Sequence, residues 1–419
     1  MTSEARGSSL KRRIRSAGGD VIRRLGLLPA GTPDGVGEDA QLLGTRFDEQ
    51  IVVPFADTPD GLYQLRQWYG PFEELARTHP LVVIASDSRT AAAVRAESSL
   101  RVVTVARYAT LDDVFSRSAV RLALYVNHNP DNFSMLRFAS MIHVSVLHGD
   151  SDKIVSVSNQ AKAYDFTFVA GQAAVDRLAR YLPLFDADAR TMIVGRPQLA
   201  PPAARPPVPA GGRATVLYAP TWEGAQPTAA YGSVASHGLE LVSRLLDDGS
   251  FDVVYRPHPL AGVREPEYGE ADAAVRAALA AATAEDPAAR HRVSGSESLA
   301  DAFAAADVLV CDVSAVAMDW LPTGRPLVVT VPASPETLTA STRLLDTVPR
   351  LAAADVPRAG SLLRTQVEVD PARDARLALL GYYLGDTSPG AAMRAFVAAC
   401  ERMLALADGP VRSVEGELL

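Results

Sequence analysis

The sequence predicts an α/β fold built from two doubly wound units of parallel strands and helices. From residue 50 onward, short runs rich in Val, Ile and Leu alternate with longer stretches of helical periodicity. A proline-rich segment interrupts this alternation once, after which it restarts. The 419 residues also exceed what one hydrophobic core usually supports, so two domains are expected.

The first half of the chain contains seven predicted strands. Their apolar residues follow one another without strict alternation, as in strands that are covered on both faces. Helical stretches such as residues 60–79 separate them, with apolar residues at helical spacing. The predicted strands are residues 50–55, 80–86, 100–106, 121–127, 142–149, 165–171 and 190–195.

The proline-rich segment, residues 197–213, has the composition of an extended and semi-rigid connector. We therefore predict a first domain over residues 45–196 and a second over residues 214–380. Two such domains leave a cleft between them, and ligands of open α/β sheets bind beyond the carboxyl ends of the strands. The predicted strands of the second domain are residues 215–222, 251–259, 291–295, 307–314 and 326–332.

The composition excludes several classes of protein. The hydrophobic fraction of 48% and the charged fraction of 21% are typical of a globular chain. The net charge of −8 argues against a nucleic-acid binder of the basic-patch type. The two cysteines, Cys311 and Cys400, match no zinc or redox spacing, so a reducing cytoplasm is the expected compartment.

The N-terminal segment, residues 1–44, is basic. It lacks the uninterrupted apolar core of a signal peptide, and no apolar run in the chain is long enough to span a bilayer. Residues 10–25 alternate apolar and basic side chains, which predicts a short amphipathic helix on an anionic membrane surface. A disordered basic tail is the alternative, because Gly18 and Gly19 would interrupt a helix.

Polar side chains gather where predicted strands end. One strand leads into His148, Gly149, Asp150 and Lys153, and a second ends at Thr221. Arg256 and His258 follow a third strand, where Pro257 and Pro259 stop the strand and stiffen the turn. A fourth strand ends at Asp312 and leads into a predicted helix that contains Ser314 and Asp319. Four polar strand exits in two sheets indicate a binding site.

These residue types suit the transfer of a phosphoryl group. The N-terminus of the helix after Asp312 offers backbone N–H groups to a phosphate, and Ser314 either contacts that phosphate or caps the helix. Arg256 and His258 suit the second phosphate of a leaving nucleotide. His148 suits a general base for an acceptor hydroxyl, because histidine titrates near neutral pH.

Other polar residues support fewer interpretations. His143 lies in mid-strand and is expected to be a core histidine, and His128 is a weaker candidate for the site. Asp150 and Asp152 either bind a cation or are solvated loop carboxylates, and the second interpretation is favoured. No spacing typical of a metal site occurs, and neither a Walker loop nor a G-x-G-x-x-G motif is present, which argues against an ATPase or a nicotinamide enzyme.

Four strings taken in order, LHGDSDK, LYAPTWEG, YRPHP and ADVLVCDVSAVAMDW, resemble signatures of the CDP-glycerol glycerophosphotransferase family of teichoic acid primases and polymerases. The resemblance covers roughly residues 120–400. It implies a GT-B arrangement of two Rossmann-like domains, with a C-terminal helical segment, residues 381–419, that crosses back to the first domain. It also implies transfer of glycerol phosphate from CDP-glycerol to a hydroxyl of a lipid-linked or polysaccharide acceptor, with release of CMP and without a metal or cofactor.

By this similarity His148 and His258 would be the essential pair. Arg256, Ser314, Asp319, Asp312 and Thr221 would lie on the donor side, and Gly149, Asp150 and Lys153 on the acceptor side. Most relatives read WHGTPLK where this chain has LHGDSDK, and DYSS where it has DVSA. These departures leave the polyol and the acceptor glycan open.

Two other functions fit the same architecture. A nucleotide-sugar glycosyltransferase would release a nucleoside diphosphate instead of CMP, and a non-enzymatic relative would bind polymer or a partner protein. The expected partners are CDP-glycerol, the acceptor and an anionic membrane surface, but not nucleic acid. The expected location is the inner face of a bacterial cell membrane, and the sequence leaves the oligomeric state open.

Overall fold

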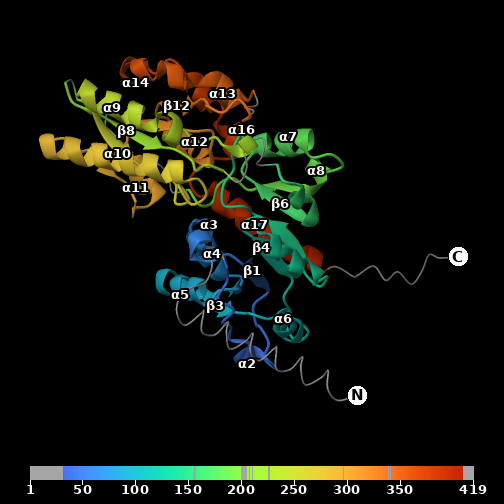
Figure 1. The fold of residues 1–419 in the computed structure, drawn as a ribbon. Helices are drawn as coiled ribbons and strands as arrows, with labels where there is room; N and C mark the ends of the chain where they lie inside the picture. Colours follow the sequence, from blue (N-terminus) through green and yellow to red (C-terminus); the bar gives the residue numbers. More distant parts are fainter. Residues whose placement is uncertain are drawn as a thin grey trace. The chain divides into compact units, whose positions relative to one another are not determined.

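The computed structural model describes residues 32–153, 157–199, 205–206, 208–209, 211–224, 227–295, 297–337, 339 and 341–408. The predicted amphipathic helix at residues 10–25 lies outside the described residues. The chain divides into two compact units, residues 1–143 and residues 144–419 (Figure 1). In the described residues, no helix combines the length and the apolar character needed to cross a bilayer.

The first unit contains four parallel strands in the order β3-β2-β1-β4. Strand β1 is buried at all five residues, as expected for a strand covered on both faces. Its strands are β1 (Ile51–Phe55), β2 (Leu81–Ala85), β3 (Arg101–Thr104) and β4 (Leu122–Tyr125). Its helices are α2 (Asp39–Leu42), η1 (Pro59–Gly61), α3 (Tyr63–Arg66), α4 (Tyr69–Ala76), α5 (Ser88–Glu97), α6 (Tyr108–Phe115) and η2 (Pro130–Arg137).

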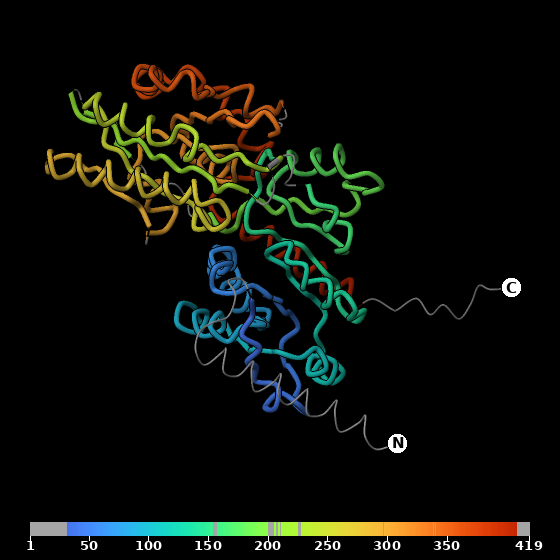
Figure 2. The backbone as a smooth tube through the Cα atoms, viewed as in Figure 1, coloured from blue at the N-terminus to red at the C-terminus, as the bar shows by residue number. Residues whose placement is uncertain are grey.

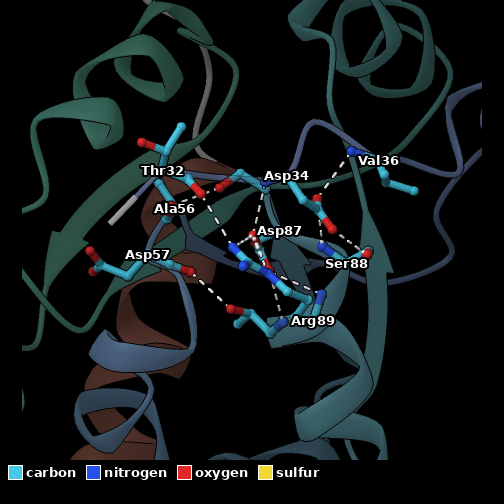
Figure 3. Close-up of polar contacts among 10 residues, drawn as sticks. Thr32, Asp34, Val36, Ala56, Asp57, Asp87, Ser88 and Arg89 are labelled. Atoms are coloured by element: carbon cyan, nitrogen blue, oxygen red, sulfur yellow. Dashed lines mark hydrogen bonds and ion pairs between the residues drawn. The ribbon is translucent and has the colours of Figure 1, made fainter. Parts of the chain in front are cut away.

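The part of the N-terminal segment that is described is fixed to the start of helix α5. The Asp87 carboxylate caps α5 and also accepts the backbone N–H of Asp34 at 2.9 Å. Asp34 in turn accepts the backbone N–H of Ser88 at 3.1 Å, and Arg89 donates to the carbonyl oxygen of Thr32 at 3.2 Å. Figure 3 shows these contacts around Asp87 and Arg89. Residues 32–36 therefore lie beside the carboxyl end of β2.

The second unit contains two groups of parallel strands. Strand β5 (Ile142–Ser145) spans the boundary between the units and is followed by β6 (Phe166–Val169) and β7 (Thr191–Ile193), in the order β5-β6-β7. The helices of this part are η4 (Asn159–Ala163), α7 (Gln172–Tyr181) and α8 (Ala187–Arg190).

The larger group is a six-stranded sheet in the order β10-β9-β8-β11-β12-β13. Its strands are β8 (Ala214–Ala219), β9 (Phe251–Tyr255), β10 (Arg292–Val293), β11 (Val308–Cys311), β12 (Leu327–Thr330) and β13 (Arg350–Leu351). Its connections include η5 (Pro227–Ala229), the π-helical turn η6 (Val234–Gly238), η7 (Leu321–Thr323) and η8 (Ala353–Arg358). The helices that follow these strands are α9 (Leu239–Asp248), α10 (Pro266–Glu285), α11 (Leu299–Ala305), α12 (Ala315–Trp320), α13 (Arg343–Thr347), α14 (Ala359–Glu368) and α15 (Arg373–Leu377).

Alternate residues of the six-stranded sheet enter two separate cores. Val216, Val253 and Val310 pack with helices α9, α10 and α14 on one face. Leu217, Val254 and Leu309 pack with helices α11, α12, α13 and α16 on the other. Both faces of the sheet are therefore covered (Figure 1), which explains the nearly continuous apolar runs in these strands.

The C-terminal helices pack on the group of strands that begins with β5. Helix α16 (Leu380–Leu384) lies beside α7, and helix α17 (Ala391–Ala407), drawn in red in Figure 2, contacts β6. The rings of Phe168 and Phe396 meet edge to face, with centroids 6.3 Å apart. A side chain at Gly171 would collide with the backbone of Tyr383. These contacts hold residues 144–196 and 380–407 in one unit.

All twelve strands predicted from apolar runs are present, and the two-residue strand β13 was not predicted. The units divide at residue 143/144, whereas the sequence placed its boundary at residues 197–213. The proline-rich segment is also more than a connector, because its Arg205 pairs with Asp307 and donates to the carbonyl oxygen of Ala304 at 3.2 Å. These contacts attach the segment to the six-stranded sheet.

Candidate active site

The candidate site lies within the second unit, at the carboxyl ends of β8, β9 and β11, together with the loop after β5. We call residues 147–153 the His148 loop. Because parallel strands end at the same edge of a sheet, the exits that hold Thr221, Arg256 and Asp312 share one edge. Three of the predicted donor-side residues therefore lie at the same edge of the sheet.

His258 is held in one orientation by its neighbours. Its ring stacks on Trp222 with centroids 6.1 Å apart and an interplanar angle of 19°. The backbone N–H of Leu260 donates to His258 Nδ1 at 3.1 Å. Burial lowers the pKa of His258 to about 3, and the nearby charges of Lys153 and His148 act in the same direction. The imidazole is therefore neutral at pH 7, with its proton on Nε2 as a hydrogen-bond donor.

Arg256 is a fixed cation at the exit of β9. Its Nη1 donates to Ser294 Oγ at 2.8 Å and to the carbonyl oxygen of Glu297 at 3.1 Å. Burial lowers the pKa of Arg256, although the charge of Glu297 opposes the shift. No described residue forms an ion pair with this guanidinium. Its orientation is thus set by neutral acceptors, and its charge is left for a ligand.

The His148 loop has a constrained backbone. Leu147 has a φ of 47°, in the left-handed region that residues other than glycine rarely adopt. A side chain at Gly149 would place its Cβ 2.9 Å from the Cβ of Ala315, the first residue of α12. The carbonyl oxygen of His148 accepts a hydrogen bond from Arg196 Nη1 at 3.3 Å. The loop is therefore in contact with the N-terminal end of α12.

Asp319 is paired with an arginine of the same unit. Its carboxylate accepts two hydrogen bonds from Arg196, at 3.0 Å each, and both side chains are buried. Burial raises the pKa of Asp319, whereas the charge of Arg196 and its hydrogen bonds lower it. We infer that Asp319 positions the His148 loop through Arg196 rather than binding the donor.

Asp312 is hydrogen bonded to residues that follow or end neighbouring strands. It is completely buried, and its carboxylate accepts the N–H of Thr221 at 2.6 Å, the N–H of Ser233 at 3.2 Å and the hydroxyl of Thr330 at 2.5 Å. Burial raises the pKa of Asp312, and these hydrogen bonds lower it. We therefore infer that Asp312 holds the ends of these strands and the following loop in position.

Ser314 begins helix α12 without capping it through its side chain. Its hydroxyl is buried and has no hydrogen-bond partner in the described part of the chain. A buried hydroxyl usually has a partner, so this oxygen is available to a ligand. The interpretation of Ser314 as a side-chain cap is not supported by this geometry.

Lys153 and Thr221 are in contact. Lys153 Nζ donates to Thr221 Oγ1 at 3.3 Å and lies 5.1 Å from the centroid of the Tyr231 ring. Burial lowers the pKa of Lys153 to about 8, and the charge of Asp312 opposes the shift. The contact with Thr221 places the lysine at the exit of β8, whereas the sequence had placed it on the acceptor side.

Asp150 and Asp152 are not solvated loop carboxylates. Both form ion pairs with Arg177 of helix α7, and Asp152 also accepts the hydroxyl of Tyr383 at 2.8 Å. Asp152 is buried, which raises the pKa of its carboxyl, and hydrogen bonds from Thr342 and Tyr383 oppose the shift. The prediction of solvent exposure was wrong because Arg177 lies 25 residues away from Asp152 in sequence.

The remaining histidines have separate environments. His143 is buried and is hydrogen bonded through Nδ1 to the Tyr125 hydroxyl at 2.8 Å and through Nε2 to the Phe138 carbonyl oxygen at 3.1 Å. The prediction of a core histidine is confirmed. His128 belongs to the first unit, where burial lowers its pKa to about 4.

Sequence reasoning missed most of the residues that hold the site in place. Glu223 directly follows the Thr221–Trp222 pair, and its carboxylate accepts the N–H of Arg264 at 2.8 Å and of Gly262 at 3.1 Å. It thereby ties the exit of β8 to the loop after His258. The only local signal was its position in the LYAPTWEG string. Arg177, Arg196, Tyr231 and Tyr383 gave no local signal, because their partners are distant in sequence.

Residues 203–336 match the family described as CDP-Glycerol:Poly(glycerophosphate) glycerophosphotransferase. The matched range covers less than half of the 419 residues. The matched range contains Thr221, Arg256, His258 and Ser314. The resemblance predicted from the four strings is confirmed, and the corresponding enzyme class is CDP-glycerol glycerophosphotransferase. No curated protein matches the sequence.

Solved structures show the same fold at low sequence identity. A variant of the wall teichoic acid polymerase TagF soaked with CDPG matches with a TM-score of 0.52 and 11% identity, over 96% of this chain and 99% of that chain. Anabaena HepE in complex with UDP and glucose matches with a TM-score of 0.50 and 11% identity, over 85% of this chain and 100% of that chain. These similarities confirm the GT-B-like α/β fold. The predicted absence of a metal or cofactor stays a prediction.

Proposed function

We propose that this CDP-glycerol glycerophosphotransferase domain moves glycerol phosphate, or a related polyol phosphate, to a hydroxyl of a cell-wall or capsular polymer. The observation that carries this proposal is the orientation of His258. Its Nδ1 accepts a backbone N–H, so the neutral ring presents a proton on Nε2. Trp222 prevents the ring from turning. A fixed neutral donor beside a fixed cation, Arg256, suits a leaving phosphate.

The reaction requires one bond to form and one to break. The acceptor oxygen attacks the phosphorus that carries the glycerol, and the bond between this phosphorus and the bridging oxygen breaks. His148 takes the proton of the acceptor hydroxyl, and CMP leaves with the bridging oxygen. The new bond is a phosphodiester between the glycerol and the acceptor.

The leaving CMP gains negative charge on its phosphate as the bond breaks. His258 Nε2–H and the Arg256 guanidinium are the groups that would receive this charge. Both are held by hydrogen bonds within the protein, so little reorganisation is needed in the transition state. The free hydroxyl of Ser314 at the start of α12 offers a further donor to the diphosphate.

The acceptor and the location of the reaction belong to the same proposal. The family name specifies poly(glycerophosphate), so a polymer with terminal hydroxyl groups is the acceptor class we expect. If the acceptor is carried on a lipid, the reaction would take place at the inner face of a bacterial cell membrane, and we include this location in the proposal. The basic residues between 10 and 25 would supply attraction to anionic lipid.

The test measures the nucleotide that is released. The purified chain is incubated with CDP-glycerol, with and without a lipid-linked glycerol phosphate acceptor, and the nucleotides are separated by chromatography. We expect CMP only when acceptor is present, and a loss of about 10²- to 10⁴-fold in His148→Ala. His143→Ala is unsuitable as a control because it disrupts the core, so His79→Ala, a half-buried position in the first unit, serves as the matched variant.

Two results would contradict the proposed function. Release of UDP from a UDP-sugar, with no CMP from CDP-glycerol, would identify a glycosyltransferase. No turnover of either donor, with retained binding of the polymer, would identify a binding protein.

A further inference from the structure

Lysine is rare in this protein. Only Lys11, Lys153 and Lys162 occur among the 41 basic residues, and all the others are arginine. An arginine spreads its charge over a planar fork, whereas a lysine presents a compact charge with three donors. Lys153 therefore brings to the candidate site a compact charge that an arginine would not provide.

The surroundings of Lys153 do not balance its charge. Its ammonium contacts the hydroxyl of Thr221 at 3.3 Å and the face of the Tyr231 ring, with 5.1 Å between Nζ and the ring centroid. No carboxylate of a described residue forms an ion pair with Lys153. The carboxylate whose charge acts on it, Asp312, already accepts hydrogen bonds from three other residues. Removing a charge from water without a paired partner is costly. An anionic ligand would offset this cost.

The neighbours of Lys153 identify the part of the ligand that it meets. Lys153 lies close enough to His258 for its charge to lower the pKa of the imidazole. The same loop touches the start of α12 through Gly149 and Ala315, directly beside the unpartnered hydroxyl of Ser314. Donors from the exits of β8, β9 and β11 thus surround one region, and each of them suits a phosphate oxygen.

We propose that the Lys153 ammonium binds a non-bridging oxygen of the donor's diphosphate. The inference rests on the proposed function for the identity of the nucleotide, but the chemical class of the ligand, a nucleoside diphosphate ester, follows from the site itself. The sequence analysis assigned Lys153 to the acceptor side of the site, whereas this proposal assigns it to the donor side. Only four residues separate Lys153 from His148, the proposed general base. Binding of the donor by Lys153 would therefore also act on the position of His148.

The experiment compares Lys153→Met with Lys162→Met. Lys162 is half-buried, belongs to the same unit and forms no side-chain hydrogen bond or ion pair with a described residue, so it controls for the loss of one lysine. Binding of CDP, UDP, CMP and cytidine is measured by titration calorimetry at pH 7 and constant ionic strength. We expect Lys153→Met to weaken CDP binding about 10- to 100-fold, the usual effect of one hydrogen bond between charged groups, and to leave cytidine binding unchanged.

Each other outcome has a defined meaning. Equal losses for CDP and cytidine would show that Lys153 supports the fold of the site, and the proposal would be wrong. Unchanged CDP binding, or no binding of any of these nucleotides by the wild-type chain, would also overturn it. If UDP binds in place of CDP and is weakened by Lys153→Met, the role of Lys153 stands and the proposed donor fails.

The pH dependence of binding provides an independent measurement. The groups that face Lys153 are Asp312, Tyr231 and the neutral His258. In the protein without ligand Lys153 has a pKa of about 8, and only its protonated form attracts phosphate. CDP affinity should therefore fall progressively as the pH rises through 8. The fall should be absent in Lys153→Met. Circular dichroism and thermal unfolding without ligand check that the variant folds.

Discussion

Arg196 and Asp319 form a two-point ion pair in which both side chains are buried, with Nε to Oδ1 and Nη2 to Oδ2 at 3.0 Å each. They are 123 residues apart in sequence. The remaining nitrogen of Arg196, Nη1, donates to the carbonyl oxygen of His148. One guanidinium therefore connects helix α12 to the residue that we propose as the general base.

Replacing Arg196 by methionine should lower the free energy of unfolding by about 3–5 kcal/mol, because it leaves the Asp319 carboxylate buried and unpaired. The double variant Arg196→Met/Asp319→Leu should recover most of that stability, since no buried charge remains. Denaturant unfolding measures both changes.

The rate of CMP release distinguishes the positioning role of Arg196 and Asp319 from their effect on stability. The double variant should remain slow in CMP release, because His148 has lost the hydrogen bond to its carbonyl oxygen. Arg364→Met is the matched control, since the Arg364–Asp248 pair lies closer to the surface and should contribute about 1 kcal/mol or less. Full activity in the stable double variant would show that Arg196 does not position His148.

Gly149→Ala should reduce turnover more than stability. The added Cβ would lie 2.9 Å from the Cβ of Ala315, so the His148 loop or the start of α12 must move. A displacement of this kind at a catalytic group costs about 10²-fold in rate. Gly381→Ala is the control, because nothing lies within 4 Å of a Cβ at that position. Wild-type kcat in Gly149→Ala would mean that the contact with Ala315 does not set the position of His148.

Two adjacent tyrosines allow a matched test of the C-terminal segment. The Tyr383 hydroxyl donates to buried Asp152 at 2.8 Å and accepts the N–H of Leu344 at 3.1 Å, whereas the Tyr382 hydroxyl donates to exposed Asp176 at 2.9 Å. Tyr383→Phe should destabilise the protein by about 1–3 kcal/mol because it leaves buried polar groups unpaired. Tyr382→Phe should change stability by less than about 1 kcal/mol. Thermal or denaturant unfolding compares them, and equal effects would contradict the role of Asp152 as an anchor.

The strands of this protein were predictable because they are buried on both faces. Strands β8, β9 and β11 consist of apolar residues that enter two cores, so each is a recognisable run in the sequence. The same regularity located the polar exits, since the apolar pattern stops where the site begins. Strand β13, with only two residues, is too short to produce such a pattern.

The functions of the acidic residues were not predictable in the same way. A strand exit reveals that Asp312 or Asp319 lies near the site, but not whether its carboxylate faces a ligand or a partner from the same chain. Arg196 belongs to a segment whose prolines indicate a connector, and Arg177 lies on an ordinary amphipathic helix. Such pairings depend on tertiary contacts between residues that are far apart in sequence, and a local pattern carries no information about them.

His258 should make the folded protein sensitive to acid. Its pKa is about 3 in the folded chain and about 6.5 in an unfolded one, so between these values the unfolded chain binds a proton that the folded chain does not. Stability is unaffected by this group above pH 6.5, falls as the pH drops below 6.5, and stops falling near pH 3. The slope for one such proton approaches about 1.4 kcal/mol per pH unit.

The variant His258→Gln isolates this contribution. His128, His237 and His291 also have lowered pKa values because they are buried, but they are present in both proteins and cancel in the difference. The stability difference between wild type and variant, measured by urea unfolding from pH 8 to pH 4.5, should therefore be constant above pH 6.5 and shift against the wild type below it. Parallel curves would mean that His258 is not held neutral. Bound CDP should reduce the effect, because a phosphate anion beside the imidazole favours its protonated form and raises its pKa toward that of the unfolded chain.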